Sequence, residues 1–350
     1  MTLNQILFCR TLRYTKTNSN NMLSTNAPSY PITRKIVMLN KYNDPISSDF
    51  FFDNCKTIVI SGGGFKALYY MGVAHAIGIE NMENFAGTSC GSAVVTLLSA
   101  GATPLEIFKR IVKKRESLGA CNDIISSQIK SHLREIQNPS RINCLASLLA
   151  MANMFIGQGV SGFVREFGDF LQDLGYSKDI TMAELKKVTG KNLAIVAAEI
   201  PSLRCVVFTA ESFPDMKVVL AVSISCSLTW PHTYDSKYYM DGVYSNNFPV
   251  DIALKLWPKD EAVCICSENS TYPQSVRETH FDRRCHFIVV PLETTCGNGI
   301  FADNTLMFVM FHFAYMFVIN SIDKVKRANA PRHNQQYSSS SSSSSLAHTP

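Results

Sequence analysis

The sequence predicts an α/β protein with a largely parallel central sheet and helices on both faces of that sheet. Two observations predict this class. Apolar runs typical of buried strands alternate with segments of helical periodicity, and the first of these units has the βαβ order of a parallel sheet. With 350 residues and a hydrophobic content of 46%, the chain is also long and apolar enough to bury a sizeable core.

The elements follow one another in a regular order. A buried strand is expected at 57–61, where the residues are apolar or β-branched, and a helix follows at 66–78. A short strand at 85–88 leads into a second helix at 90–100. Pro104 in a first turn, and apolar residues at helical spacing before Gly175, predict two further helices. The remaining strands or strand-led units are expected at 193–200, 204–209, 218–223, 262–266 and 287–290.

The chain is expected to divide into four segments. Residues 1–50 form a polar, basic extension whose composition also resembles an organelle transit peptide, and residues 336–350 form a serine-rich tail. Both are too polar to pack, so we expect them to be disordered. Residues 51–255 contain the predicted site, and residues 256–335 add strands and an apolar helix that complete the domain.

Charge and cysteine content exclude two kinds of partner. The formal net charge of +5 is modest and the basic residues are spread along the chain, so we expect no nucleic-acid binding. The eleven cysteines form no C-x-x-C pair, and Cys264-x-Cys266 lacks a histidine at zinc-ligand spacing, so we expect no metal site. The first apolar stretch, Ile6-Leu7-Phe8, is too short for a signal peptide, which favours an intracellular location.

One pentapeptide points to a nucleophile. Gly87-Thr88-Ser89-Cys90-Gly91 lies between an expected strand and an expected helix. A Gly-x-Ser-x-Gly motif on a strand-to-helix turn is how many hydrolases expose a nucleophilic serine. Ser89 is therefore the candidate nucleophile, and an acyl hydrolase is the leading hypothesis.

A glycine-rich loop precedes this turn and offers backbone donors. Gly62, Gly63 and Gly64 follow the first strand, and Lys66 opens the next helix. Successive amides in such a loop can hold a developing oxyanion, and the loss of one such donor typically costs about 10²- to 10³-fold in rate. Lys66 is expected either to orient the loop, to meet an anionic head group or to be a plain solvated lysine.

The candidate base is a carboxylate at the end of another strand. Asp241 ends the run Tyr238-Tyr239-Met240 and is followed by Gly242. The carboxyl ends of parallel strands are where α/β sites assemble. An aspartate of ordinary pKa, about 4, is a weak base toward an alcohol, so most of the rate enhancement is expected from the loop amides and the helix after Ser89.

These motifs together resemble the patatin-like phospholipase family. The segment from Ser61 to Ala67 is similar to the family's oxyanion loop, Gly87 to Gly91 to its nucleophile motif, and Asp241-Gly242 to its aspartate motif, all in the right order over roughly residues 55–255. Two positions depart from the pattern. Ala67 replaces the loop's last glycine, and Val243 replaces a small residue beside the aspartate.

The resemblance implies the fold and the chemistry. It implies a patatin-like three-layer architecture with a catalytic domain at 51–255, and a Ser-Asp dyad of Ser89 and Asp241 that cleaves lipid acyl esters without a metal or organic cofactor. The substrate is then a phospholipid, lysophospholipid or triacylglycerol at a membrane or lipid-droplet surface. Val243 is the position where a β-branched residue would crowd the turn that aims Asp241.

Three alternatives remain at this stage. A Ser-Asp-His triad is open because His280, His286 and His312 follow Asp241. A non-catalytic lipid-binding protein with a degraded site would account for Val243. A dinucleotide fingerprint would use the glycine loop together with Glu83.

Two apolar segments suggest contact with membranes. Residues 306–319 interleave aromatic residues and methionines around His312 and are short for a spanning helix, which needs about 20 residues. We expect a buried or interfacial helix, and hence peripheral rather than single-pass attachment. Residues 145–156 are similarly apolar and are expected to form a core helix, with a lid or a second interfacial surface as the alternatives.

Overall fold

The computed structural model describes residue 52 and residues 54–117, 159–228, 230–267, 284–291 and 304–329. The predicted extension at 1–50, the apolar segment 145–156, His280 and the tail at 336–350 lie outside the described residues.

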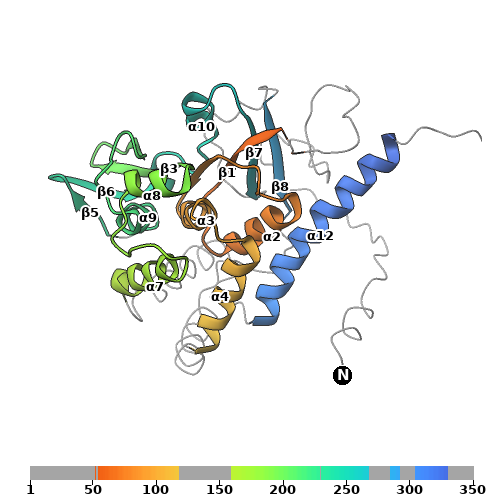
Figure 1. The fold of residues 1–350 in the computed structure, drawn as a ribbon, viewed down its shortest axis with the longest axis horizontal. Helices are drawn as coiled ribbons and strands as arrows, with labels where there is room; N and C mark the ends of the chain where they lie inside the picture. Colours follow the sequence, from red (N-terminus) through yellow and green to blue (C-terminus); the bar gives the residue numbers. More distant parts are fainter. Residues whose placement is uncertain are drawn as a thin grey trace, which may run out of the picture. The chain divides into compact units, whose positions relative to one another are not determined.

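An eight-stranded mixed sheet forms the centre of the fold (Figure 1). The strand order is β5-β6-β3-β2-β1-β7-β8, and β4 pairs with β3. The strands β1, β2, β3, β7 and β8 are mutually parallel where they pair, whereas β4, β5 and β6 join by antiparallel pairing. The strands span Cys55–Ile60 (β1), Asn84–Thr88 (β2), Asn192–Ile200 (β3), Arg204–Phe208 (β4), His232–Tyr234 (β5), Lys237–Asp241 (β6), Glu261–Ser267 (β7) and Cys285–Val290 (β8).

Helices cover both faces of this sheet, as predicted. Alternation along β1 shows the two faces, because Ile58 and Ile60 join the larger core cluster while Val59 joins the smaller one. In the view of Figure 1, α10 lies above the sheet, and α2, α4 and α7 lie below it. The helices span Ala67–Ile77 (α2), Cys90–Ser99 (α3), Pro104–Ser117 (α4), Gly159–Asp173 (α7), Met182–Thr189 (α8), Val218–Ser225 (α9), Val250–Leu256 (α10) and Asn304–Asn329 (α12), with 3-10 turns at Gly64–Lys66 (η1) and Gly242–Tyr244 (η2).

One predicted element is of the wrong type. The segment 218–223 was expected to be a strand-led unit, but it forms the helix α9. Nearly every residue of α9 is buried and apolar or small. A helix that is buried on all sides loses the 3.6-residue periodicity that would distinguish it from a buried strand.

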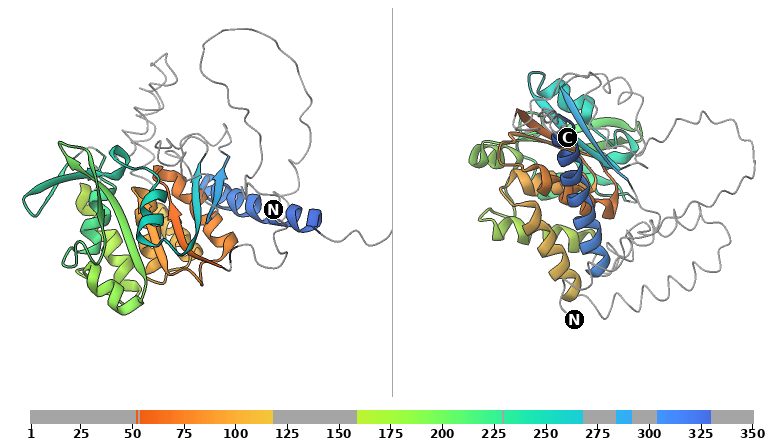
Figure 2. Two further views of the ribbon diagram at one scale, coloured as in Figure 1. Left: turned by 90° about the horizontal axis from the view of Figure 1, so that it is seen from above. Right: turned by 90° about the vertical axis from the view of Figure 1, so that its right-hand side faces the viewer.

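The helix α12 is longer than the apolar segment predicted at 306–319. It has 26 residues, and its stretch Leu306–Lys324 is, by length and composition alone, apolar enough to cross a membrane. One face nevertheless packs on α2, where Figure 2 shows it as the blue helix at the β8 end of the sheet. The approach is close, because a Cβ atom at Gly72 would lie 2.2 Å from the carbonyl oxygen of Phe311. The opposite face leaves Phe308, Val309 and Met316 exposed.

Candidate active site

Ser89 lies on a sharp, strained turn between β2 and α3. Its backbone has φ 53° and ψ −130°, a region that residues other than glycine rarely occupy. The flanking glycines are required by close packing. A Cβ atom at Gly87 would lie 2.6 Å from the carbonyl carbon of Gly91, and one at Gly91 would lie 2.4 Å from the carbonyl oxygen of Ile60. The turn therefore has the geometry of a nucleophile elbow.

The structure brings Ser89 and Asp241 together. The Ser89 hydroxyl donates a hydrogen bond to Oδ2 of Asp241 at 2.8 Å. Asp241 is the last residue of β6, and a Cβ atom on the following Gly242 would lie only 2.4 Å from the carbonyl oxygen of Val196 in β3. Both predicted residues thus belong to one site, held by the ends of two strands.

Burial changes the chemistry of Asp241. The carboxylate is completely shielded from solvent, and this burial raises its pKa from 3.8 to about 7. The backbone N–H of Val243, at 2.9 Å from Oδ1, and the Ser89 hydroxyl partly offset the rise in pKa. The expectation of an ordinary pKa is therefore wrong, because the sequence does not reveal how deeply the strand end is buried.

The end of α9 and the residues after it support both Ser89 and Asp241. The Ser225 hydroxyl accepts a hydrogen bond from the Ser89 backbone N–H at 2.9 Å and donates one to the carbonyl oxygen of Val196 at 2.6 Å. Two residues later, the carbonyl oxygen of Ser227 accepts the Asp241 backbone N–H at 2.9 Å. The sequence places Ser225-Cys226-Ser227 before the aspartate but gives no sign of these contacts, which require the folded position of α9.

The three amides of the glycine loop have different partners. The N–H groups of Gly63 and Gly64 approach the sulfur of Cys90, the residue that follows Ser89. Gly62 is different, because its N–H donates to the backbone oxygen of Asn247 at 2.9 Å. The expectation that Gly62 also supplies an oxyanion donor is therefore wrong. Its lack of a side chain matters instead, since a Cβ atom there would lie 2.3 Å from Oδ1 of Asn247 and 3.1 Å from Cβ of Ser89.

The two positions that depart from the family pattern fit the structure. Ala67 has φ −48°, so no glycine is needed there. Val243 points outward and is 37% exposed, so its branched side chain does not crowd the turn, and its backbone N–H holds Asp241.

Lys66 lies beside the loop and is partly buried. A Cβ atom at Gly63 would lie 2.9 Å from Cδ of Lys66, so the aliphatic part of the lysine packs over the loop. Burial lowers the pKa of its ammonium group, while Cys90 and Cys266 act in the opposite direction. Among the described residues, no carboxylate forms an ion pair with Lys66.

The described residues do not assemble the two rival sites. His286 lies at the amino end of β8, and His312 lies on α12; neither is hydrogen-bonded to Ser89 or Asp241. Glu83 precedes β2 and pairs with Lys56 at 2.9 Å. A dinucleotide site needs its acidic residue near the carboxyl ends of the strands, whereas Glu83 lies at the amino end of β2.

Comparison with known proteins decides the family. The model of the patatin-like phospholipase family matches residues 58–254, more than half of the chain. The chain belongs to this family. Ser89 and Asp241 both lie within the matched region of the patatin-like domain, as do the glycine loop and the segment at Ser225.

A curated relative and two solved structures are also similar. "Probable lipid hydrolase 463L" of Invertebrate iridescent virus 6 is 28% identical over 266 residues, which cover 73% of this chain and 84% of the relative. The crystal structure of VipD from Legionella pneumophila matches with a TM-score of 0.46 and 15% identity, covering 77% of this chain and 67% of VipD. The type III effector protein ExoU of Pseudomonas aeruginosa matches with a TM-score of 0.45 and 16% identity, covering 78% of this chain and 53% of ExoU. Family membership and the relative's name support a hydrolase that acts on lipids.

Proposed function

We propose that this patatin-like protein hydrolyses lipid acyl esters through a Ser-Asp dyad and an acyl-enzyme intermediate. The observation that carries the proposal is the 2.8 Å hydrogen bond from Ser89, on its strained turn, to the buried Asp241. A serine hydroxyl is a poor nucleophile without a base in hydrogen-bond reach. A carboxylate with a pKa of about 7 is far better matched to this task at neutral pH than an ordinary aspartate.

In the first half-reaction, the ester acylates the serine. Ser89 Oγ attacks the carbonyl carbon of the ester while its proton passes to Oδ2 of Asp241. The tetrahedral intermediate then collapses, the bond to the alcohol oxygen breaks, and Asp241 returns the proton to the leaving alcohol. The alcohol product is a lysophospholipid, a glycerophosphodiester or a diacylglycerol, for a phospholipid, lysophospholipid or triacylglycerol substrate respectively, and the fatty acyl group stays on Ser89.

Amides of the glycine loop stabilise the oxyanion in this mechanism. The N–H groups of Gly63 and Gly64 face the Cys90 sulfur. A thiol is a weak hydrogen-bond acceptor, so a charged oxygen at the neighbouring Ser89 competes well for these donors. The amino end of α3, which begins at Cys90, adds the positive end of its dipole. Lys66 orients the loop by packing over Gly63.

In the second half-reaction, water replaces the alcohol. Asp241 accepts a proton from water, which attacks the acyl carbonyl carbon, and the same amides hold the second oxyanion. Collapse breaks the bond to Ser89 Oγ, the fatty acid leaves, and Asp241 returns the proton to the serine. Each cycle consumes one ester and one water and needs no metal or organic cofactor.

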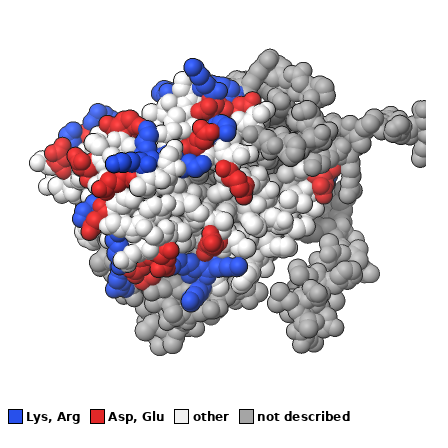
Figure 3. Space-filling model, in the orientation of Figure 1, with Lys and Arg blue, Asp and Glu red and all other residues white. Residues whose placement is uncertain are grey.

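The proposed partner is a lipid surface, to which the protein attaches peripherally inside the cell. The exposed side of α12 carries Phe308, Val309 and Met316. Charged side chains gather at the left, the top and the lower left of Figure 3, whereas the area over α2 and the middle of α12 is largely uncharged. An apolar helix face of this kind suits the boundary between head groups and acyl chains.

Fatty-acid release from separate phospholipid, lysophospholipid and triacylglycerol dispersions tests the proposal. Ser89→Ala and Asp241→Asn should each reduce release by about 10³-fold or more, because the two residues act as a unit. Ser202→Ala and Asp215→Asn are the matched controls, since both side chains are exposed and far along the chain from the dyad. The lipid that the parent protein cleaves identifies the substrate class.

Two outcomes would contradict the dyad. Full fatty-acid release by Ser89→Ala would show that Ser89 is not the nucleophile. Loss of release only when His286 or His312 is replaced would point to a triad. A folded parent protein that releases no fatty acid from any of the three lipids, and does not react with a fluorophosphonate, would be a binding protein.

A further inference from the structure

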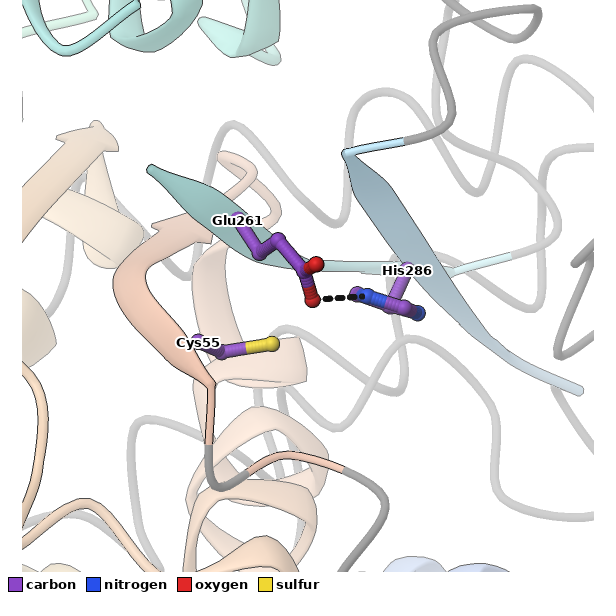
Figure 4. Close-up of side chains that lie close together, drawn as sticks. All are labelled: Cys55, Glu261 and His286. Atoms are coloured by element: carbon purple, nitrogen blue, oxygen red, sulfur yellow. Dashed lines mark hydrogen bonds and ion pairs between the residues drawn. The ribbon is translucent and has the colours of Figure 1, made fainter. Parts of the chain in front are cut away.

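A second cluster of reactive side chains lies at the amino ends of three strands, at the opposite end of the sheet from Ser89. Cys55 begins β1, Glu261 begins β7, and His286 is the second residue of β8 (Figure 4). These strands are parallel neighbours, so their amino ends lie side by side, while Ser89 follows the carboxyl end of β2. The cluster therefore has no part in the proposed reaction.

Strand register fixes this juxtaposition. Cys55 pairs in register with Glu261, and His286 with Val263, two residues further along β7. Glu261 and His286 each lie two residues before a member of the larger core cluster, Val263 and Ile288, and residues two apart in a strand share a face. Cys55 belongs to the same core cluster. All three side chains thus point to the same face of the sheet.

We propose that Cys55, Glu261 and His286 bind a divalent metal ion of the zinc class. The donor atoms of the three side chains all lie within 4.8 Å of one another, and Nε2 of His286 lies 3.1 Å from Oε2 of Glu261. Zinc bond lengths in a tetrahedral site place pairs of donor atoms roughly 3.3 to 3.6 Å apart. The longest donor-to-donor distance has to shorten by about 1 Å, and rotation of the partly exposed Glu261 and His286 side chains can supply this change.

The donor set selects the metal. A thiolate, an imidazole and a carboxylate are the three protein ligand types of zinc, and together they give the two negative charges that a divalent ion neutralises. Calcium and magnesium prefer sites made of oxygen alone. The Cys55 side chain is buried, whereas those of His286 and Glu261 are 23% and 43% exposed, so water can reach a fourth coordination position from the solvent side.

The surroundings suit a stabilising site. The ring of Phe52 packs edge-on against His286, with the ring centres 6.2 Å apart. A metal ion bound here would join the amino ends of three strands that are distant in the sequence. We expect it to stabilise the folded chain and to leave ester hydrolysis unchanged.

Zinc binding to the full-length protein tests the site. After treatment with a chelator and dialysis, titration with zinc chloride followed by calorimetry should show one strong site per chain, and elemental analysis should find one zinc. Zinc at about a hundredfold excess over Kd should raise the thermal midpoint by roughly 5 °C. Cobalt chloride should give a thiolate-to-metal charge-transfer band in the near ultraviolet.

Matched variants decide whether these three residues are the ligands. His286→Gln and Glu261→Gln should weaken zinc binding by about tenfold or more, and Cys55→Ser should abolish the charge-transfer band. His312→Gln and Cys205→Ser, both exposed and outside the cluster, should behave like the parent protein. If Cys55→Ser does not fold, the variants at the two partly exposed positions, Glu261 and His286, still decide the question.

Two results would overturn the proposal. The first is a parent protein that binds no zinc at micromolar free concentration, in which case Glu261 and His286 form an ordinary ion pair beside a buried thiol. The second is zinc binding that His286→Gln and Glu261→Gln do not weaken, which would mean adventitious binding elsewhere. Neither result bears on the Ser-Asp dyad, because binding and thermal stability are measured without substrate.

Discussion

Thr88 and Asp241 occupy successive positions along one edge of β3, since Thr88 is in register with Val196 and Asp241 with Ala197. The strand β4 takes the other edge at the same residues, so β2 and β6 share this edge and end facing one another. The residue after Thr88 is Ser89, which therefore meets Asp241. Three paired strands, rather than flexible loops, set the distance between the proposed nucleophile and its base, which favours precise catalysis.

The first prediction concerns the pH dependence of hydrolysis. Asp241 must be ionised to accept the serine proton, and its pKa is raised to about 7. Below that pH, kcat/KM should fall about tenfold per pH unit, and above it the rate should level off. A soluble short-chain ester is the right substrate, because it stays dissolved at every pH, whereas the surface charge and packing of a lipid vesicle change with pH. A rate that stays constant from about pH 5 to about pH 8 would mean that Asp241 has an ordinary pKa.

The second prediction concerns the effect of Asp241 on stability. In the unfolded chain the carboxyl ionises near pH 3.8, and in the folded chain near 7. Between these values the folded state holds a proton that the unfolded state has lost, so the stability of the parent protein falls as pH rises and stays low above 7. Asp241→Asn should therefore be more stable than the parent protein, by up to roughly 4 kcal/mol above pH 7, with no gain below about pH 4.

Urea unfolding of both proteins at several pH values measures this difference. Asp215→Asn, at an exposed aspartate, is the control and should show no such trend. Equal stability of Asp241→Asn and the parent protein at all pH values would contradict the raised pKa. The prediction implies that the site is held at the expense of stability, as is common where a charged group is buried for function.

The local motifs of the site could be read from the sequence because each depends on near neighbours. A strand, a turn and a helix within a few residues predict where Ser89 lies, and the glycines at 87 and 91 are required by contacts inside that same unit or with the adjacent strand. The parallel pairing of β1 with β2 follows for the same reason, since β1, α2 and β2 form one continuous βαβ unit.

The remainder depends on residues that are distant in the sequence. The raised pKa of Asp241 results from burial by the whole fold, and the Gly62 amide is occupied by Asn247, far along the chain. The cluster of Cys55, Glu261 and His286 could not be predicted, because no short spacing joins these residues. Only the register of three strands brings them together. The helix α9 was missed because burial on every side removes its periodicity.

The third prediction makes Ser225 a positioning residue. Ser225→Ala removes the acceptor of the Ser89 backbone N–H and should let the strained turn relax. We expect kcat to fall about tenfold with little change in KM, and the reaction of Ser89 with a fluorophosphonate to slow in parallel. Ser223→Ala is the matched control, because that buried hydroxyl of α9 donates to Val219 within the helix. Equal effects of the two variants on labelling would show that Ser225 has only a structural role.

The last prediction tests the exposed face of α12. Val309 is 48% exposed on this helix, and Val188 is 61% exposed on α8, on another part of the surface. A charge placed in a lipid interface is costly, so Val309→Asp should weaken co-sedimentation with phospholipid vesicles by about tenfold, while Val188→Asp should bind like the parent protein. Hydrolysis of a soluble ester should be the same in all three proteins, because neither valine touches the dyad. Equal vesicle binding by the two variants would rule out this face of α12 as the lipid contact, and loss of soluble-ester hydrolysis in Val309→Asp would mean that the substitution had disturbed the packing of α12 on α2.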